Sequence, residues 1–363
     1  MKNLVLLVVS IGFTLGICEV FLRYQPFVTL NYDRVPETLD PPARISYWTH
    51  HMSPIHPDVQ TADWGKDCSE GAHGVTVLFL GDSWMESMDG IPKGFADEFL
   101  RRNPDLTCLH AVNGGVSSYA PTLYLIKGDW LLRSNRVDLV VVNVDETDLM
   151  DETLRYRRTT LRDRDGQIER VVPNVVDLVT LYKRATLQHQ PIYLLRLLED
   201  IYYDQVLVPR LRLEFYGTAK PINEYPQIMA PQVSADPIGT YGAEIEYFRS
   251  TLREMLTRFV NRVGASRVVV VHHPHYLHLK SAPADKRYNT IVSSVLKEET
   301  DGFGVQFYDA LADLDALPPE EAAKLFKWPE DPFSHLTTEG YLRYGRLMAD
   351  HLTGQNGPLT NTH

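Results

Sequence analysis

Basic residues are in short supply in this chain. The 363 residues include 36 Lys and Arg against 47 Asp and Glu, which gives a formal net charge of −11. No run of more than two consecutive Lys or Arg residues occurs in the sequence. Proteins that bind nucleic acid carry clustered basic residues that meet the phosphates. We therefore expect no nucleic-acid partner.

Internal repeats and low-complexity tracts are also absent. Hydrophobic residues make up 44% of the chain and charged residues 23%, the composition of an ordinary globular protein. Disorder is therefore not expected over most of the length, and 363 residues are enough for one or two domains with a sizeable core.

Cysteine is scarce, with only Cys18, Cys68 and Cys108. Cys18 follows Ile17, which is too bulky for the small residue that a lipoprotein signal requires, so we expect no lipid on it. In an oxidising compartment Cys68 and Cys108 would close a loop of about 40 residues, which stabilises a fold by a few kcal/mol. The alternative is two separate buried thiols, and the sequence leaves both open.

Charge is nearly absent from residues 3–22, NLVLLVVSIGFTLGICEVFL, where Glu19 is the only charged residue. About 20 such residues in a helix span roughly 30 Å of hydrocarbon. No small-x-small cleavage site follows, so we expect a retained membrane anchor, with a cleaved signal peptide as the alternative. Lys2 and the amino terminus predict that the rest of the chain faces outward, which in a bacterium means an inner-membrane protein with its domain in the periplasm or outside the cell.

Short, continuous apolar runs alternate with helical patterns along the rest of the chain. Such runs are typical of strands covered on both faces, and they lie at residues 75–80, 106–112, 138–144, 266–273 and 305–310. Helical periodicity occurs between them, clearest at 121–131, opened by Pro121, and at 245–260. The sequence therefore predicts an α/β fold: a three-layer sandwich with a mainly parallel sheet.

The expected organisation follows from these patterns: an anchor at 1–24, an extended lead at 25–73, an α/β domain at 74–353 and a flexible tail at 354–363. Residues 152–240 interrupt the alternation as a long insertion, with a helix expected at 191–208. Long insertions in compact domains are usually functional or linking. This one is either a packed subdomain or a lid or substrate platform over the carboxyl ends of the strands, where open α/β sheets bind ligands.

The stretch VLFLGDSWMESM, residues 77–88, ends a predicted strand abruptly in Gly-Asp-Ser. Ser83 either caps a following helix, a common use of serine, or projects into a crevice at the carboxyl edge of the sheet. Three further segments follow in order at later positions: NGGVSSYAP (113–121), NVDETDLMD (143–151) and DPFSHLTTEGY (331–341).

Together these four blocks resemble the SGNH, or GDSL-type, hydrolase family over residues 74–353, apart from much of the insertion. The segment CEVFLR, residues 18–23, is also typical of exported bacterial members. The resemblance implies a three-layer α/β fold in which Ser83 is the nucleophile and His335 the base. Asp331 would orient the His335 ring, although it lies four residues before it where the family has two or three. No metal or organic cofactor is implied.

The resemblance also implies donors for the oxyanion. The backbone N–H of Ser83 is one, and the N–H at the family's glycine position, here Ser118, is another, with Gly115 as the fallback. Thr147 stands where the family has an asparagine whose side chain is a third donor. Losing one such donor typically costs 10²–10³ in rate.

The proposed chemistry also follows from the residues themselves. A serine hydroxyl is a poor nucleophile at neutral pH, so an imidazole must take its proton and a third group must fix the imidazole tautomer. Ser83, His335 and Asp331 would fill these roles.

Four histidines lie close together in VHHPHYLH, residues 271–278, and His-x-His spacing is used by metal sites. Because no Asp, Glu or Cys neighbours them in the sequence, we interpret the segment as a polar loop at a strand end, with one histidine lining the active-site crevice. DRDGQ, residues 163–167, lacks the later ligands of a calcium loop and is interpreted as a turn.

The sequence thus predicts a serine-dependent ester hydrolase or acyl transferase that acts on O-acyl groups, most simply those of a cell-envelope or extracellular glycan. The alternative is a glycan-binding or assembly subunit that has kept the fold and lost turnover, because the chain departs from the family pattern at Ser118, at Thr147 and in the Asp331 spacing.

Overall fold

The computed structural model describes residues 2–23, 59–69, 73–172, 179, 192–216, 229–331 and 334–353. The chain forms two units, which are described separately below. One comprises Met1–Ser53 and Val172–Glu224, and the other Pro54–Val171 and Tyr225–His363. The predicted tail at 354–363 and most of the predicted lead, residues 24–58, lie outside the described residues.

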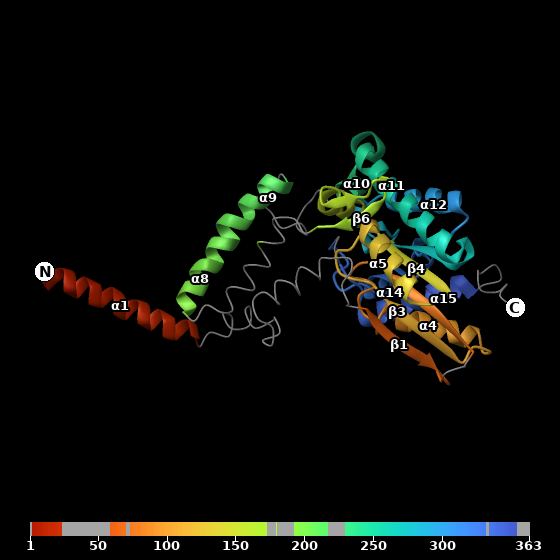
Figure 1. The fold of residues 1–363 in the computed structure, drawn as a ribbon, viewed down its shortest axis with the longest axis horizontal. Helices are drawn as coiled ribbons and strands as arrows, with labels where there is room; N and C mark the ends of the chain where they lie inside the picture. The colour runs from red at the N-terminus through yellow and green to blue at the C-terminus, as the bar shows by residue number, and fades with distance from the viewer. Residues whose placement is uncertain are drawn as a thin grey trace. The chain divides into compact units, whose positions relative to one another are not determined.

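A six-stranded sheet forms the centre of the larger unit, with strand order β1-β3-β2-β4-β7-β8 (Figure 1). Neighbouring strands from β3 to β8 run parallel, and β1 is antiparallel to β3. The strands are β1 Gln60–Gly65, β2 Gly74–Leu80, β3 Cys108–Asn113, β4 Leu139–Asp145, β7 Val268–His273 and β8 Gln306–Asp309. All five predicted strands and the mainly parallel α/β fold are confirmed.

Strand β1 lies inside the segment expected to be an extended lead, so the sheet begins nearer the N-terminus than predicted. It pairs with β3 from Gln60 opposite Asn113 to Gly65 opposite Cys108. Most of its residues are exposed, as on an edge strand, so its sequence shows no continuous apolar run. An apolar run was the signal used for the other strands, which explains why this one was missed.

A disulfide joins Cys68 to Cys108, with 5.0 Å between their Cα atoms. Of the two alternatives that the sequence left open, the structure contains the bridge. Cys108 opens β3 and Cys68 follows β1, so the bond closes the amino end of β3 against the edge strand. Cys18 is free.

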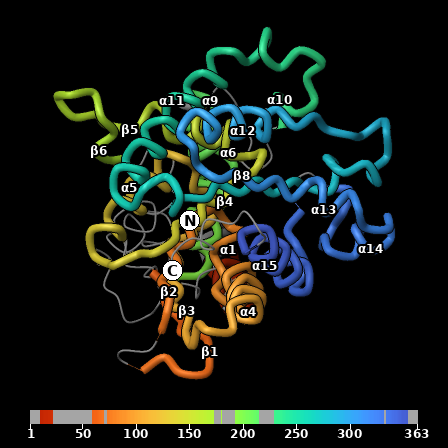
Figure 2. The backbone as a smooth tube through the Cα atoms, turned by 90° about the vertical axis from the view of Figure 1, so that its right-hand side faces the viewer, coloured from red at the N-terminus to blue at the C-terminus, as the bar shows by residue number. Residues whose placement is uncertain are grey.

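Helices cover both faces of the sheet. Helices α4 (Ile91–Arg102) and α15 (Thr338–Thr353) pack against each other on one face, and α5 (Pro121–Ser134), α11 (Pro237–Val263) and α12 (Ile291–Phe303) lie on the other (Figures 1 and 2). Both predicted helical patterns are confirmed in α5 and α11. Alternate residues of β2 face the two layers: Phe79 contacts Phe95 of α4, while Leu80 lies beside Phe259 and Gly128.

Shorter elements connect these layers. They are α6 (Asp148–Asp151), η1 (Glu152–Tyr156), α10 (Ala230–Val233), η4 (Ala265–Arg267), η5 (Tyr276–His278), η6 (Ala284–Lys286), α13 (Leu311–Asp315) and α14 (Pro319–Lys324). The first part of the insertion forms a hairpin of β5 (Thr160–Arg162) and β6 (Ile168–Val171), which is held to α11 because Glu254 accepts from Arg162 and from the Ile168 N–H. The turn predicted at 163–167 is confirmed, with Gly166 at φ +77°.

The smaller unit contains α1 (Lys2–Arg23) and the helical run α8 (Tyr193–Tyr202), η2 (Tyr203–Leu207) and α9 (Val208–Tyr216). The helix predicted at 191–208 is confirmed. Glu19 accepts hydrogen bonds from the N–H groups of Tyr193 and Leu194, the otherwise unsatisfied donors at the start of α8. Among the residues that the structure describes, no helix is both long and apolar enough to cross a membrane. A lid role for the insertion stays a prediction.

Candidate active site

Ser83 lies in the turn that follows β2. Strand β2 ends at Leu80, while α4 begins only at Ile91 and has Gly90 as its N-cap residue. Ser83 therefore does not cap this helix, and the capping alternative is excluded. A side chain on Gly81 would come within 2.9 Å of the Met85 Cβ, so the glycine of the Gly-Asp-Ser sequence allows the turn to fold closely onto the strand ends.

The structure brings Ser83 and His335 together from opposite ends of the domain. The Ser83 Oγ and the His335 Nε2 are 2.9 Å apart, a hydrogen-bond distance, although 252 residues separate them. A backbone bond from the Lys327 N–H to the His335 carbonyl and the β-bridge between Phe326 and Leu336 fix the segment that carries the ring. The predicted nucleophile and base thus have the geometry that their roles require.

His335 is poised as a neutral base. Burial lowers the pKa of its ring below 6.5, and the charges of Lys327 and His275 lower it further. Two carboxylates, Asp145 and Asp331, act in the opposite direction without reversing the shift. The imidazole is therefore neutral at pH 7, and its Nε2 lone pair is available to accept the Ser83 proton.

Asp331 affects His335 through its charge. It is exposed, and its backbone joins the loop through bonds to Trp328 and Ser334. Within the described residues, no hydrogen bond joins the Asp331 carboxylate to the His335 ring. The predicted hydrogen bond from the His335 ring to the Asp331 carboxylate is therefore absent from this conformation. The Asp331 charge still favours the protonated ring, because it raises the pKa of His335.

Asp82 is a neighbour of the nucleophile that the sequence analysis did not single out, although it is the middle residue of Gly-Asp-Ser. Its Oδ2 lies 3.3 Å from the Ser83 Oγ, and its Oδ1 accepts from the Trp84 N–H. Burial raises the pKa of the Asp82 carboxyl well above its usual range, and the nearby Asp145 raises it further. The Ser83 hydroxyl therefore has two acceptors within reach, the Asp82 Oδ2 and, at the shorter distance, the His335 Nε2.

Ser118 adopts the backbone conformation that explains why the family has glycine here. Its φ is 62°, the one positive φ among the non-glycine residues that the structure describes. For a residue with a Cβ this left-handed region costs roughly 1–2 kcal/mol. Such strained positions cluster at functional sites. Within the described residues, neither Ser83 nor Ser118 donates its backbone N–H to a protein acceptor, as expected of two oxyanion donors.

The other two predicted donors are already engaged. The Gly115 N–H donates to the Asn113 Oδ1 at 2.9 Å, and a side chain on Gly115 would collide with the Met85 backbone, so this glycine serves close packing. Thr147 donates both its N–H and its hydroxyl to the Asp145 Oδ1, at 2.7 and 2.6 Å. In this structure both predicted donors are therefore engaged by internal acceptors.

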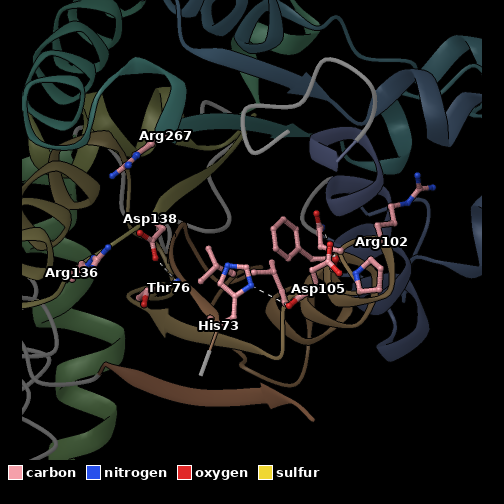
Figure 3. Close-up of a pocket in the computed structure, with 13 residues that line it drawn as sticks. His73, Thr76, Arg102, Asp105, Arg136, Asp138 and Arg267 are labelled. Carbon is pink, nitrogen blue, oxygen red and sulfur yellow. Dashed lines mark hydrogen bonds between the residues drawn. The ribbon is translucent and has the colours of Figure 1, made fainter. Parts of the chain in front are cut away.

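An open groove of about 710 Å³ lies in front of the Ser83–His335 pair. Its lining is largely polar and includes Gln60, Glu86, Ser117, Lys327 and Tyr341. A second cavity, of about 650 Å³, lies at the opposite, amino end of the strands (Figure 3). There the Asp138 carboxylate accepts from the Thr76 N–H, and a ring nitrogen of His73 contacts the Asp105 carbonyl. Neither Ser83 nor His335 lines this second cavity.

The four histidines of residues 271–278 are all buried, with exposures of 0–4%. We use the name buried histidine cluster for these residues and the three carboxylates beside them, which are His272, His273, His275, His278, Asp145, Glu146 and Asp309. None of the four histidines is among the described residues that line the groove, so the expectation that one would do so is wrong. The sequence showed no nearby carboxylate because the acids come from β4 and β8, which pair with β7 only in the folded sheet.

His272 is the most tightly paired member of this cluster. Its Nε2 contacts the Glu146 Oε1 at 2.8 Å and its Nδ1 the Asp309 Oδ1 at 3.0 Å. Burial alone would lower the pKa of the ring, but the two carboxylates outweigh it and raise the pKa to about 10. His272 is therefore a buried cation held between two anions.

Comparison with known proteins gives weak likenesses. No family model and no curated protein matches the chain. Similar solved structures include a lipase/acylhydrolase from Enterococcus faecalis, at 12% identity and a TM-score of 0.41, covering 77% of this chain and 96% of that one. A variant of the acetyl-xylooligosaccharide esterase Axe2 from Geobacillus has 14% identity and a TM-score of 0.41, covering 79% and 97%. A putative GDSL-like lipase from Parabacteroides merdae has 12% identity and a TM-score of 0.40, covering 78% and 97%.

These scores are too low to carry an argument about activity. The likeness to the SGNH type rests on the four sequence blocks and on the geometry that they adopt here.

Proposed function

We propose that this protein is an SGNH-type serine hydrolase that cleaves or transfers an ester-linked acyl group. The observation that carries the proposal is the 2.9 Å contact between the Ser83 Oγ and the His335 Nε2 at the carboxyl edge of a parallel sheet. A serine and a neutral imidazole in hydrogen-bond contact form the activated nucleophile of acyl-transfer chemistry.

In the proposed reaction, the Ser83 Oγ attacks the acyl carbon while the His335 Nε2 takes the hydroxyl proton. The N–H groups of Ser83 and Ser118 hold the oxygen that becomes negative. The imidazolium, favoured by the Asp331 charge, then protonates the leaving alkoxide, which departs and leaves an acyl group on Ser83. Water or an acceptor hydroxyl then attacks the acyl carbon while giving its proton to His335. The acyl group leaves on the new oxygen, and the imidazolium returns the proton to the Ser83 Oγ.

The proposed substrate is an O-acylated glycan. An open groove with many polar side chains suits a chain of hydroxyl groups better than a long acyl tail, which needs an enclosed apolar cavity. We also propose that the domain works outside the cytoplasm, in the periplasm or beyond it. The Cys68–Cys108 disulfide supports this location, because such bonds persist in oxidising compartments.

A binding or assembly subunit without turnover is the second candidate. The engagement of the Thr147 hydroxyl by Asp145 favours it, since the third oxyanion donor is missing. One missing donor typically lowers the rate 10²–10³-fold without abolishing it. The intact contact between Ser83 and His335 favours the enzyme.

The two candidates separate in a burst assay of the full-length protein with 4-nitrophenyl acetate. We expect rapid release of nitrophenolate equivalent to one acyl group per chain, followed by slower turnover. Ser83→Ala and His335→Gln should each lower the rate by about 10⁴-fold, because a dyad member is lost. Ser117→Ala is the matched control, since Ser117 lines the same groove without contacting the dyad, and it should retain activity.

Labelling with a fluorophosphonate provides a readout that does not depend on the natural substrate. The probe should modify Ser83 in the wild type and fail in Ser83→Ala. If the wild type showed neither turnover nor labelling, the proposal that the protein is an enzyme would be contradicted. A binding or assembly subunit would then be the remaining candidate.

A further inference from the structure

Three side chains of the buried histidine cluster meet at one point behind the nucleophile turn. Asp145 ends β4 and His273 ends β7, and the parallel pairing of these strands places the two residues opposite each other. His275 follows two residues later. The exposures of Asp145, His273 and His275 are 1%, 0% and 2%. The Trp84 ring stacks on His273, with 3.8 Å between ring centroids, and turns its edge to His275.

The distances among the three possible ligand atoms match those around one small metal ion. The Asp145 Oδ2 lies 3.1 Å from the His275 Nε2 and 3.5 Å from the His273 Nε2, and all three ligand atoms lie within 4.8 Å of one another. Ligands held about 2.1 Å from a tetrahedral zinc ion are about 3.4 Å apart. Both distances from the Asp145 Oδ2 fit this spacing, and the two histidine nitrogens lie within 4.8 Å of each other.

Hydrogen bonds hold the Asp145 carboxylate in place, and its Oδ2 contacts the His275 Nε2 at 3.1 Å, a contact that a bound metal ion would replace. The other oxygen of Asp145, Oδ1, accepts from the Thr147 N–H, the Thr147 hydroxyl and the Asp148 N–H, so Oδ2 alone faces the histidines. Among the described residues the His273 Nε2 has no hydrogen-bond partner, although it is fully buried. An orphaned ring nitrogen in a protein core calls for a ligand.

The second nitrogen of His273 contacts the Asn143 side-chain amide at 2.7 Å, and the same amide contacts the Tyr344 hydroxyl at 3.0 Å. As the side chain is placed, the Asn143 Nδ2 faces the His273 Nδ1, and the Asn143 Oδ1 accepts from the Tyr344 hydroxyl. The amide oxygen and nitrogen are assigned from hydrogen bonds, and exchanging them also leaves both neighbours satisfied. In the exchanged orientation the Asn143 oxygen accepts from the His273 Nδ1–H, and the Nε2 lone pair points at Asp145, the usual arrangement around a metal-bound histidine.

We propose that Asp145, His273 and His275 bind one divalent transition-metal ion, with Zn²⁺ preferred, behind Trp84. Two imidazoles and one carboxylate form a borderline donor set, which suits zinc and its neighbours better than Ca²⁺ or Mg²⁺. The ion would tie the carboxyl ends of β4 and β7 together. The proposal goes beyond the esterase function and does not depend on it, because the Ser83–His335 chemistry uses no metal.

The only other group with metal-ligand spacing among the described residues is Asp63, Cys108 and His110. Cys108 is bound to Cys68 and offers no thiolate, Asp63 is exposed, and His110 is only partly buried. This surface group therefore serves as a control for adventitious binding.

The test measures bound metal directly. Because the site is buried, the full-length protein is expressed in minimal medium supplemented with Zn²⁺ or with Co²⁺, so that the ion is present during folding. After desalting, we expect about one metal ion per chain by mass spectrometry, and the Co²⁺ protein should show the intense visible absorption of a tetrahedral site. Removing the ion with a chelator should lower Tm, and adding Zn²⁺ back should restore it.

Matched variants decide where the ion lies. His273→Gln and His275→Gln should each weaken binding more than the roughly 10–100-fold that a lost supporting contact costs. His278→Gln, in the same buried loop but outside the three ligands, and His110→Gln, at the surface group, should keep the ion. Circular dichroism checks that each variant is folded.

Two results would overturn the proposal. One is a folded wild-type protein without stoichiometric metal from either medium. The other is binding that survives in both His273→Gln and His275→Gln, or that is lost in His110→Gln. Neither result bears on the esterase, whose readout is fluorophosphonate labelling of Ser83.

Discussion

Two polar groups lie at the carboxyl edge of the same sheet, and they differ in what surrounds them. The Ser83–His335 pair faces an open groove, and burial and neighbouring charge keep its imidazole neutral. His272, in the buried histidine cluster, is enclosed by two carboxylates that keep it charged. The difference shows that the partners and exposure of an imidazole, rather than its place at a strand end, set its protonation state.

The comparison predicts that substitutions in one group affect mainly activity and substitutions in the other affect mainly stability. Substitution at the groove should reduce turnover with little effect on folding, and substitution in the cluster should do the reverse. The predictions below test this, beginning with the largest expected effect.

Opening the disulfide should reduce stability while leaving the dyad intact. The bond closes a loop across 40 residues of sequence, which stabilises a fold by about 4 kcal/mol in the chain-entropy model. Urea unfolding of Cys68→Ala/Cys108→Ala measures this loss, with Cys18→Ala as the control. Because Cys108 lies at the opposite end of the sheet from Ser83, the esterase rate per folded molecule should not change. An unfolding midpoint that is insensitive to reductant would contradict the prediction.

Breaking the His272 pair should be nearly as costly. His272→Gln leaves Glu146 and Asp309 facing each other without a cation, and removing one partner of a buried pair costs about 3 kcal/mol or more. Urea unfolding at 25 °C measures the change, while the rate per folded molecule should stay within about twofold. The control is His351→Gln, since His351 is stacked on Tyr308 and should cost about 1 kcal/mol or less. A similar loss in both variants would remove the special role of His272.

The pH dependence of kcat/KM should follow the protonation of His335. The base must be neutral, and the pKa of His335 lies below 6.5, so kcat/KM should be level above that pH and fall about tenfold per pH unit below its pKa. The charged or titratable groups that act on the ring are Lys327, His275, Asp145 and Asp331. Lys327→Gln removes a positive charge and should move the midpoint upward. A wild-type midpoint above 6.5 would contradict the assignment of His335 as a base held neutral by burial.

The smallest effect concerns the strained serine. Ser118→Gly removes the strain of a Cβ at φ 62°. Glycine also has more conformational freedom in the unfolded chain, which offsets part of this gain, so the free energy of unfolding should rise by about 0.5–1 kcal/mol. The N–H is retained, so activity should be unchanged or higher. Ser117→Gly provides the control, because Ser117 has no positive φ to relieve and its substitution should gain nothing. Destabilisation by Ser118→Gly would show that the serine side chain holds the turn.

The sequence by itself determined most of the sheet and the dyad. Five strands were readable because a strand covered on both faces must be apolar throughout, as in residues 138–144. Ser83 and His335 were readable because each lies in a short block whose chemistry is local.

Tertiary structure alone decided the rest. The edge strand β1 has no apolar run, and its place depends on pairing with β3. Thr147 donates to Asp145 and Gly115 donates to Asn113, which engages both of these predicted oxyanion donors. The carboxylates around His272 and His273 come from β4 and β8, more than 30 residues away in sequence, and meet them only when parallel strands align their ends. A motif whose residues are close together can be recognised in the sequence. A site assembled from several strands of a sheet exists only once the chain has folded.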